Sequence, residues 1–220
     1  MFLDVLEYTN PFYKQSYSLG YTFVITHFPW LWGLFFSLLD QPWMFGVMTA
    51  ARRLHNLIHA RAFHRYLEEQ QFDYIISTHF LPNEVASALK RQGRITSKII
   101  SVVTDYDVHR IWISKGIDRY AVASHWTKRK IVSLGVDAAM VYVTGIPTEE
   151  KFSSHSDIPA LKRKLGLKED VFSVLVATGS FGIGPIEEIV DNLKGMQILV
   201  ICGHNQKLFE RLNQKADSLV

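Results

Sequence analysis

The strongest fold signal in the chain is Val171-Phe-Ser-Val-Leu-Val-Ala-Thr-Gly-Ser-Phe-Gly-Ile-Gly-Pro185. Its apolar first half predicts a buried strand, and Pro185 is typical of the first position of a helix. Glycines between the two elements allow positive φ and a close approach of the backbone, and the N–H groups of a helix start favour an anion. The stretch therefore predicts an α/β fold with a phosphate-binding turn.

Two other interpretations of this turn have to be weighed. A glycine-rich connection also occurs wherever a strand and a helix are joined tightly, and Glu187 and Glu188 would compete with an anion for the helix dipole. Alternatively, Thr178-Gly179 and the two later glycines fall one residue short of the Thr-Gly-x-x-x-Gly-x-Gly turn of short-chain dehydrogenases. That fingerprint opens the first βαβ unit of its domain, whereas most of this chain precedes it, so a complete dehydrogenase is excluded.

The composition is that of an ordinary globular protein. Of the 220 residues, 48% are hydrophobic and 20% are charged, which fits one large domain or one and a half average ones. The net charge of +3 is too small to indicate a nucleic-acid partner. Cys202 is the one cysteine, which excludes an internal disulfide and favours a reducing, cytoplasmic setting. The N-terminus lacks the pattern of a secretory signal, so secretion is unsupported.

Histidine spacing predicts no metal site. His55 and His59 form an i, i+4 pair, but Asn56 stands where the helix of a zinc protease carries Glu. A solvated or interfacial helix face explains the pair better. The sequence also lacks the Gly-x-Ser-x-Gly elbow of a nucleophilic serine.

Apolar, β-branched runs alternate with helical segments along most of the chain. The predicted strands are Tyr74–Ser77, Ile99–Thr104, Tyr120–Ala123, Val141–Thr144, Val171–Ala177 and Ile198–Cys202. The predicted helices are Arg52–Glu69, Pro82–Arg91, Thr127–Leu134, Pro159–Leu165 and Pro185–Leu193. This alternation is typical of parallel sheets covered on both faces, so the predicted fold class is α/β.

A break in this pattern divides the chain. A polar, serine-rich stretch follows Thr144, and a fresh strand with its own glycine-rich turn comes after it. We predict a first domain at 1–147, a linker at 148–165 and the start of a second domain at 166–220. Residues 1–6, Met-Phe-Leu-Asp-Val-Leu, are predicted to form a buried strand, and both domains are expected to be incomplete.

The segment Gln15–Leu39 is rich in aromatic residues and holds no Lys, Arg, Asp or Glu. Its length suits a transmembrane helix, but Pro29 and several polar residues interrupt it. Docking at the headgroup boundary of a membrane is therefore preferred over a buried core, a dimer surface or a true span. The predicted membrane-facing residues are Phe28, Trp30, Trp32, Phe35 and Phe36. The next segment, with Arg52, Arg53, Arg61 and Arg65, can face anionic lipid, although a solvated helix face explains it almost as well.

Polar residues follow two of the predicted strands. Thr78-His-Phe-Leu-Pro82 follows one, and Thr104-Asp-Tyr-Asp-Val-His109 follows the next. Because ligands collect at the carboxyl ends of parallel strands, we expect both turns to face one cleft. Asp105 can orient or activate a hydroxyl, His109 can exchange a proton, and His79 can hydrogen-bond a substrate. Capping or turn formation explains each residue alone, but together they favour a site.

In this order the motifs resemble the monogalactosyldiacylglycerol synthase and processive diacylglycerol glucosyltransferase family. The matching pieces, which cover nearly the whole chain, are Asp4–Tyr13, Thr78–Pro82, Val103–His109 with Trp112, Gly145–Thr148 with Lys151-Phe152, Gly179–Glu188 and Cys202–Asn205. The resemblance implies a GT-B architecture, in which two Rossmann-like domains face each other across a cleft. It also implies that no metal or other cofactor is needed, because helix starts and backbone amides offset the diphosphate charge.

The resemblance also implies roles for individual residues. The donor-binding residues would be Gly179, Ser180, Phe181, Gly182, Gly184, Gly203, His204 and Asn205. The acceptor-binding residues would be His79, Phe80, Pro82 and Trp112, with Asp105 and His109 as the catalytic candidates. The implied reaction is transfer of a hexose from a UDP-sugar to diacylglycerol, by a peripheral protein on the cytoplasmic face of the cell membrane. The expected partners are the two substrates and a membrane surface that includes anionic lipid, but no nucleic acid.

Two family motifs are missing from the sequence. The glycine-rich loop with the His thought to deprotonate the acceptor would precede Asp4, and the Gly-Gly turn with its sugar-binding Glu would follow Val220. The chain is therefore expected to be an inactive fragment of an enzyme. The alternatives are a related transferase that acts on a polyprenyl-linked or other acceptor, and a non-catalytic membrane-docking module that binds a nucleotide.

Overall fold

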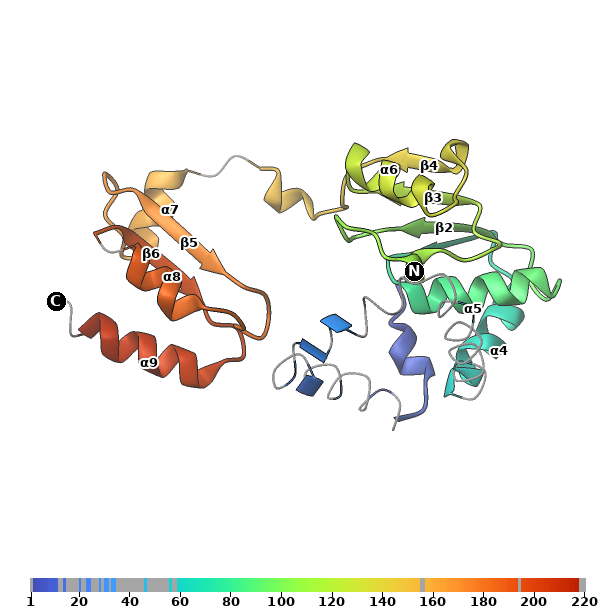
Figure 1. The fold of residues 1–220 in the computed structure, drawn as a ribbon, viewed down its shortest axis with the longest axis horizontal. Coiled ribbons are helices and arrows are strands. Elements are labelled where there is room, and N and C mark those ends of the chain that lie inside the picture. The colour runs from blue at the N-terminus through green and yellow to red at the C-terminus, as the bar shows by residue number, and fades with distance from the viewer. Residues whose placement is uncertain are drawn as a thin grey trace. The chain divides into compact units, whose positions relative to one another are not determined.

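The computed structural model describes residues 2–11, 59–154, 157–193 and 195–217 continuously, together with isolated positions between 14 and 56. The chain divides into two compact units, Met1–Thr148 and Glu149–Val220 (Figure 1). This division falls at the start of the predicted linker, 148–165. Helix α7 (Ile158–Lys164) lies inside that predicted range and belongs to the second unit.

The first unit is built on a four-stranded parallel sheet. Its strands, in spatial order, are β1 (Tyr74–Ser77), β2 (Lys98–Val102), β3 (Arg119–Val122) and β4 (Val141–Val143). Its helices are α4 (Arg61–Gln70), α5 (Phe80–Arg91) and α6 (His125–Ser133), and its short 3-10 turns are η1 (Val5–Tyr8), η2 (Arg110–Trp112) and η3 (Ala138–Met140). Helix α5 packs on β1 and β2 and beside α4, whereas α6 packs on β3 and β4 (Figure 1).

The contact between α5 and β2 shows why this unit holds together. Val85 and Leu89, four residues apart on one face of α5, are 1% and 0% exposed, and Ile99 on β2 is also fully buried. Burial of each such side chain contributes about 1.5–3 kcal/mol. The Asn83 amide donates to Ser101 Oγ at 2.7 Å inside this contact, so a polar bond as well as apolar packing fixes the helix to the strand.

The second unit has the same elements on a smaller scale. Strands β5 (Ser173–Ala177) and β6 (Gln197–Ile201) pair in parallel. Helices α8 (Ile186–Asn192) and α9 (Gln206–Asp217) and the 3-10 turn η4 (Glu150–Phe152) accompany α7. Its buried apolar cluster consists of Val176, Ile186, Cys202 and Leu208. Both units thus carry parallel strands alternating with helices, and the predicted α/β class is confirmed.

The predicted strand at residues 1–6 is wrong over the described positions 2–6. Phe2 is fully exposed, and Val5 and Leu6 belong to the turn η1. The Asp4 carboxylate accepts the N–H of Leu6 at 2.9 Å, which gives this segment a local partner where a strand would need a neighbouring strand. Val5 and Leu6 still pack against the core of the first unit, and this contact explains the apolar sequence.

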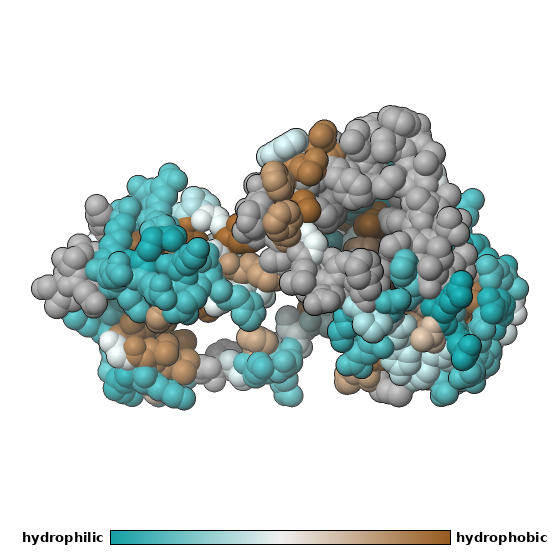
Figure 2. Space-filling model, turned by 90° about the horizontal axis from the view of Figure 1, so that it is seen from below, coloured by the Kyte–Doolittle hydropathy of each residue, from teal (hydrophilic) through white to brown (hydrophobic). Residues whose placement is uncertain are grey.

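Part of the aromatic segment is described. Phe28 and Trp30 are 42% and 67% exposed, and hydrophobic residues are visible at the surface in Figure 2. Trp32, Phe35 and Phe36 lie outside the described residues, as do Arg52 and Arg53. Within the part of the chain that the structure describes, no helix is both long and apolar enough to cross a membrane. The membrane-facing role of the segment stays a prediction.

Candidate functional site

The turns after β1 and β2 leave the sheet at one edge. The two strands are parallel neighbours, with Ser77 opposite Ser101, so the chain emerges from both on the same side. His79 follows β1 and Asp105 follows β2, and the Trp112 side chain contacts both of them, by an edge-on ring contact with His79 and a hydrogen bond to Asp105. The structure therefore brings these two predicted site residues together.

His79 is the N-cap of α5. Its Nδ1 accepts the N–H of Leu81 at 3.3 Å, so the proton of the neutral ring lies on Nε2. Burial lowers the pKa of His79, and the Asp105 carboxylate only partly opposes this effect. The neighbouring Phe80 ring lies against the imidazole, with 4.0 Å between ring centroids. His79 is therefore mainly a neutral imidazole at pH 7, with its ring proton on Nε2.

Asp105 is exposed, and a buried side chain holds its carboxylate. The indole N–H of Trp112 donates to Oδ2 of Asp105 at 2.7 Å, while Trp112 is only 3% exposed. The same indole meets the rings of Phe80 and His79 edge-on, with centroids 6.3 Å and 6.4 Å away. Trp112, predicted to bind the acceptor, thus lies beneath the site rather than on its surface.

His109 caps the short turn η2. Its Nδ1 accepts the N–H of Ile111 at 3.2 Å, so proton exchange with a substrate would have to use Nε2. Asp107, two residues earlier, lies 3.9 Å from the ammonium group of Lys130 on α6. The geometry gives His109 a clear structural task, and its predicted catalytic role stays a prediction.

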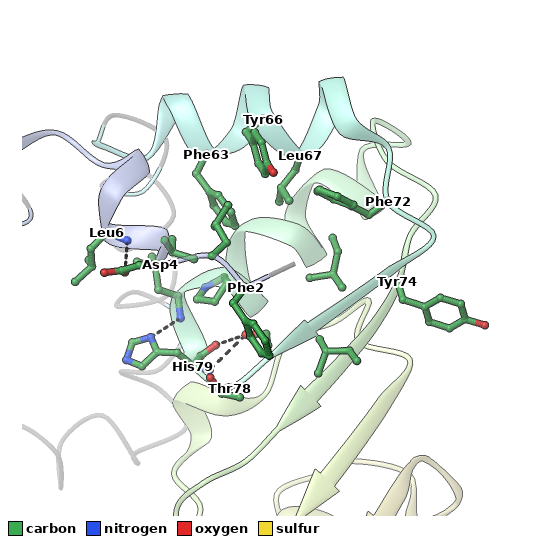
Figure 3. A pocket seen from close by; sticks show the side chains of 17 residues that line it. Phe2, Asp4, Leu6, Phe63, Tyr66, Leu67, Phe72, Tyr74, Thr78 and His79 are labelled. Carbon is green, nitrogen blue, oxygen red and sulfur yellow. Dashed lines mark hydrogen bonds between the residues drawn. The ribbon is translucent and has the colours of Figure 1, made fainter. Parts of the chain in front are cut away.

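A cavity of about 800 Å³ opens beside the β1 turn (Figure 3). Apolar side chains from α4, such as Phe63 and Leu67, and from the N-terminal segment, such as Phe2, line much of it. Its polar end is formed by Thr78 and His79, close to Pro82 at the start of α5. The acceptor-binding candidates His79 and Pro82 therefore share one cavity wall.

The outer edge of β1 forms another part of that wall. All four residues of β1 line the cavity although successive side chains point to opposite faces, so the cavity runs along the edge of the strand. Among the described residues β1 pairs with β2 alone, and backbone groups on its other edge require polar partners. An acyl chain offers none. We therefore include only the polar end, Thr78 and His79, in the candidate site.

In the second unit, two glycines hold two turns together. Gly182 and Gly203 have φ of 55° and 56°. A Cβ on Gly182 would collide with the carbonyl of Cys202, and a Cβ on Gly203 would collide with the carbonyl of Ser180. The contact between the turns therefore requires these two glycines, and their predicted role in donor binding stays a prediction.

Gly179 differs from this pair. Its φ is 86°, yet no atom lies within 4 Å of the position of a Cβ, and the residue is exposed. Gly184, with φ of 131°, is similarly open. The exposed residues Ser180 and Phe181 lie between them, and the Phe181 ring is 6.1 Å from that of His204. This side of the turn is open to solvent.

Asn205 ties the same turns to α9. Its amide donates to the carbonyl of Gly182 at 3.0 Å, and its Oδ1 accepts the N–H of Leu208 at 3.0 Å. Asn205 therefore caps α9 and fixes the Gly182 turn with one side chain. The predicted donor-binding residues Gly179–Gly184 and Gly203–Asn205 lie together, as the pairing of β5 with β6 requires.

The structure also alters the electrostatics predicted for this turn. Glu187 on α8 pairs with Arg211 on α9, with 2.9 Å between Oε2 and the guanidinium, and this hydrogen bond lowers the pKa of Glu187. Because Arg211 balances its charge, Glu187 competes less with an anion than the sequence indicated. The partner lies 24 residues away on another helix, and the sequence carried no signal for the pair.

One further anchor escaped the sequence analysis. Thr127 on α6 donates its hydroxyl to the carbonyl of Tyr106 at 2.9 Å and thereby fixes the turn that carries Asp105. The spacing from the N-cap Ser124 indicates a helix start but not this distant contact. Among the described residues, no group of three or more His, Cys, Asp or Glu side chains is arranged to hold a metal ion.

Two solved structures are similar to the chain. A crystal structure of HepE from Anabaena in complex with UDP-glucose matches 82% of this chain and 51% of that chain, with 13% identity and a TM-score of 0.49. The apo form of the lipopolysaccharide outer core galactosyltransferase WaaB matches 63% of this chain and 38% of that chain, with 16% identity and a TM-score of 0.41.

Sequence comparisons point to one family. Processive diacylglycerol β-glucosyltransferases from Staphylococcus haemolyticus and Bacillus subtilis are 34% and 27% identical over 69% and 95% of this chain. The chain spans 40% and 52% of the length of these two relatives, or about half. The family model of monogalactosyldiacylglycerol (MGDG) synthase matches residues 1–148, which include the β1 and β2 turns. The chain therefore belongs to the monogalactosyldiacylglycerol synthase family.

Proposed function

We propose that this chain is part of a glycosyltransferase that moves a hexose from a UDP-sugar to the free hydroxyl of diacylglycerol. The observation that carries the proposal is that His79 and Asp105, at one edge of the sheet, both contact the Trp112 side chain, inside the region that matches the family model. The names of the curated relatives support the lipid acceptor. Because the chain spans about half the length of those relatives, the activity is proposed for the whole protein.

In the proposed reaction, the acceptor oxygen forms a bond to the anomeric carbon of the sugar while the bond from that carbon to the diphosphate breaks. The hydroxyl proton passes to a base, and UDP leaves with the electron pair. Asp105 is our candidate for orienting or deprotonating the hydroxyl, and His109 for proton exchange through Nε2. His79 would hold the acceptor through its Nε2–H. Phe80 and Pro82 would border the acceptor, and the buried Trp112 would support the site from the interior of the first unit.

The second unit is proposed to bind the donor through the turns 179–184 and 203–205. Backbone amides there would stabilise the negative charge of the leaving diphosphate, so the reaction would need no metal ion or other cofactor. The open surface at Gly179 and the balanced charge of Glu187 support this assignment. The residues that distinguish glucose from galactose are not assigned.

We also propose that the protein works at the cytoplasmic face of the cell membrane as a peripheral protein. Exposed aromatic rings such as Phe28 and Trp30 suit the boundary between headgroups and acyl chains. The exposed Arg65 on α4 carries a positive charge that suits anionic lipid. The enzyme would then reach an acceptor that stays in the bilayer.

The test is to incubate the complete reading frame with diacylglycerol liposomes and labelled UDP-glucose or UDP-galactose, and then to separate the lipids. A labelled glycolipid would establish the reaction and name the sugar. Label transferred only to a polyprenyl-linked or soluble acceptor would contradict the lipid part. Binding of UDP-sugar and liposomes without any transfer would favour a non-catalytic docking module.

Two neighbouring aspartates supply a matched pair of variants. Asp105→Asn is expected to lower kcat about 100-fold or more, because it removes the carboxylate that would act on the hydroxyl. Asp107→Asn is expected to retain activity within about twofold, because Asp107 is exposed and its interaction with Lys130 is a long surface pair. Equal losses in the two variants would contradict the role of Asp105.

A further inference from the structure

Trp112 occupies an unusual position for so large a side chain. It ends a three-residue 3-10 turn, η2, and yet is only 3% exposed, while Ile111 beside it is 9% exposed. These two side chains anchor the turn in the first unit. Because a buried indole N–H needs a hydrogen-bond acceptor, the identity of that acceptor decides what Trp112 does.

The acceptor is a side chain of the candidate site. The indole N–H reaches Oδ2 of Asp105 at 2.7 Å, within the range of a hydrogen bond to a charged carboxylate. Asp105 itself is exposed, so without this bond its carboxylate would be free to choose among rotamers. A rigid, buried ring thus limits the positions open to an exposed carboxylate.

The same ring contacts the other strand-end turn. The planes of Trp112 and Phe80 cross at 87°, and those of Trp112 and His79 cross at 64°, both in the edge-to-face arrangement that aromatic pairs favour. His79 and Phe80 belong to the turn after β1, whereas Asp105 belongs to the turn after β2. One indole therefore touches both halves of the site.

His109 holds the ring at this place. Its Nδ1 accepts the N–H of Ile111, the second residue of η2, at 3.2 Å, and the turn then directs Trp112 into the interior. The chain of contacts runs from His109 through η2 to Trp112, and from Trp112 to Asp105 and His79.

We infer that Trp112 is a positioning residue, which fixes the Asp105 carboxylate through its indole N–H and holds it beside His79. With Oδ2 engaged by the indole, Oδ1 is the oxygen that meets the acceptor hydroxyl. The effect on catalysis rests on the proposed function, whereas the link from Trp112 through Asp105 to His79 does not. The competing explanation is that Trp112 merely fills space in the core, in which case another aromatic ring would serve as well.

The variant Trp112→Phe separates these explanations, because Phe keeps a packed ring and removes the N–H donor. The first measurement is the titration of the His79 imidazole by NMR in the full chain. Because the Asp105 carboxylate raises the pKa of His79, its release is expected to lower that pKa further. Asp105→Asn removes the charge altogether and sets the largest downward shift that can be expected. Trp126→Phe, at a ring that is 49% exposed, is the control and is expected to leave His79 unchanged.

A His79 titration that is the same in Trp112→Phe as in the unchanged protein would overturn the inference, whatever the activity. If Trp112→Phe does not fold, Asp105→Asn provides the reverse measurement, since it changes an exposed residue. The Trp112 indole N–H resonance should then move away from its hydrogen-bonded position. A Trp112 indole N–H resonance that is unchanged in Asp105→Asn would equally overturn the inference.

Kinetics of the complete reading frame then test the catalytic consequence. Trp112→Phe is expected to lower kcat about tenfold or more with KM within about twofold, as for loss of a hydrogen bond to a charged group that acts in the transition state. A rise in KM with unchanged kcat would contradict positioning and support direct binding of the acceptor. A shifted His79 titration without any glycolipid product would leave the link intact and reject the proposed function instead.

Discussion

The two units differ in whether side chains or backbone groups hold their turns in position. In the first unit, side chains tie the strand-end turns together: His79 caps α5, and Trp112 holds Asp105. In the second unit the turns meet mainly backbone to backbone, at Gly182 and Gly203, where no side chain fits, and the Asn205 amide adds one side-chain bond. The difference matches the proposed tasks, because an acceptor hydroxyl needs groups that exchange protons, whereas a diphosphate is held well by fixed amide dipoles.

The two units also differ in how much they bury. The first has four strands and an extensive buried cluster, whereas four buried apolar residues make up the cluster of the second. Leu175 on β5 is 62% exposed and Leu89 on α5 is fully buried. Two strands with a small core are marginal by themselves, so the described part of the second unit is the less stable of the two.

The largest expected effect breaks the core of the first unit. Leu89→Ala should lower the free energy of unfolding of that unit by about 3 kcal/mol, because it leaves a cavity in a well-packed core. Leu175→Ala, on an exposed strand position, should cost less than about 0.5 kcal/mol. Hydrogen exchange of amides in α5 and in β5 measures the two effects separately. Similar costs at both sites would refute the contrast in packing.

The next largest effect is expected at the contact between the two glycine-containing turns of the second unit. Gly203→Ala should destabilise the second unit by about 3 kcal/mol, since the new Cβ would meet the Ser180 carbonyl at a positive φ. Gly179→Ala has a positive φ but open space, so about 1 kcal/mol is expected. Exchange protection of α9 amides reports on both. If Gly179→Ala proved the more damaging, the assignment of the open side of the turn would be wrong.

The stability of the first unit should depend on pH. Burial lowers the pKa of His79 and of His64 below the usual 6.5, so the unfolded chain binds more protons than the folded one once the pH falls through about 6.5. The free energy of unfolding of the first unit should therefore decrease as the pH is lowered from 7 through 6. His79→Asn replaces the capping Nδ1 by a side-chain oxygen that can also cap, and it removes one titrating group, so it should weaken this dependence. An unchanged pH dependence in that variant would contradict the prediction.

The smallest expected effect lies on the surface of the second unit. Arg211→Gln should raise the pKa of Glu187 toward its ordinary value, because the hydrogen bond from Arg211 is the main cause of the lowering. Lys215→Gln should raise it less, since Lys215 acts only through its charge. NMR titration of the Glu187 carboxyl group compares the variants, and stability should change little in either. Equal rises of the Glu187 pKa in the two variants would show that the hydrogen bond from Arg211 has no effect beyond that of its charge.

Much of the fold could be predicted from local pattern. Continuous apolar runs gave β1 its correct bounds and the other strands bounds within about two residues, because parallel strands are buried on both faces. Residues 1–6 were misjudged for the same reason: an apolar run does not reveal whether it packs as a strand or as a capped turn. Asp4, which caps η1, was the one local signal against a strand.

The sequence by itself determined the α/β class and the motifs that belong to one family. It also determined that polar turns follow β1 and β2 and that glycine-containing turns follow β5 and β6. These follow from periodicity and residue type, which act over a few neighbouring positions. Only the tertiary structure decided that the Trp112 indole holds Asp105, that Arg211 balances Glu187, and that Gly182 and Gly203 serve each other's turns. The partners in the last two of these contacts lie at least 20 residues apart, and even the nearer Trp112 depends on how η2 folds back toward β1. Such contacts are set by the packing of whole elements, which no local pattern encodes.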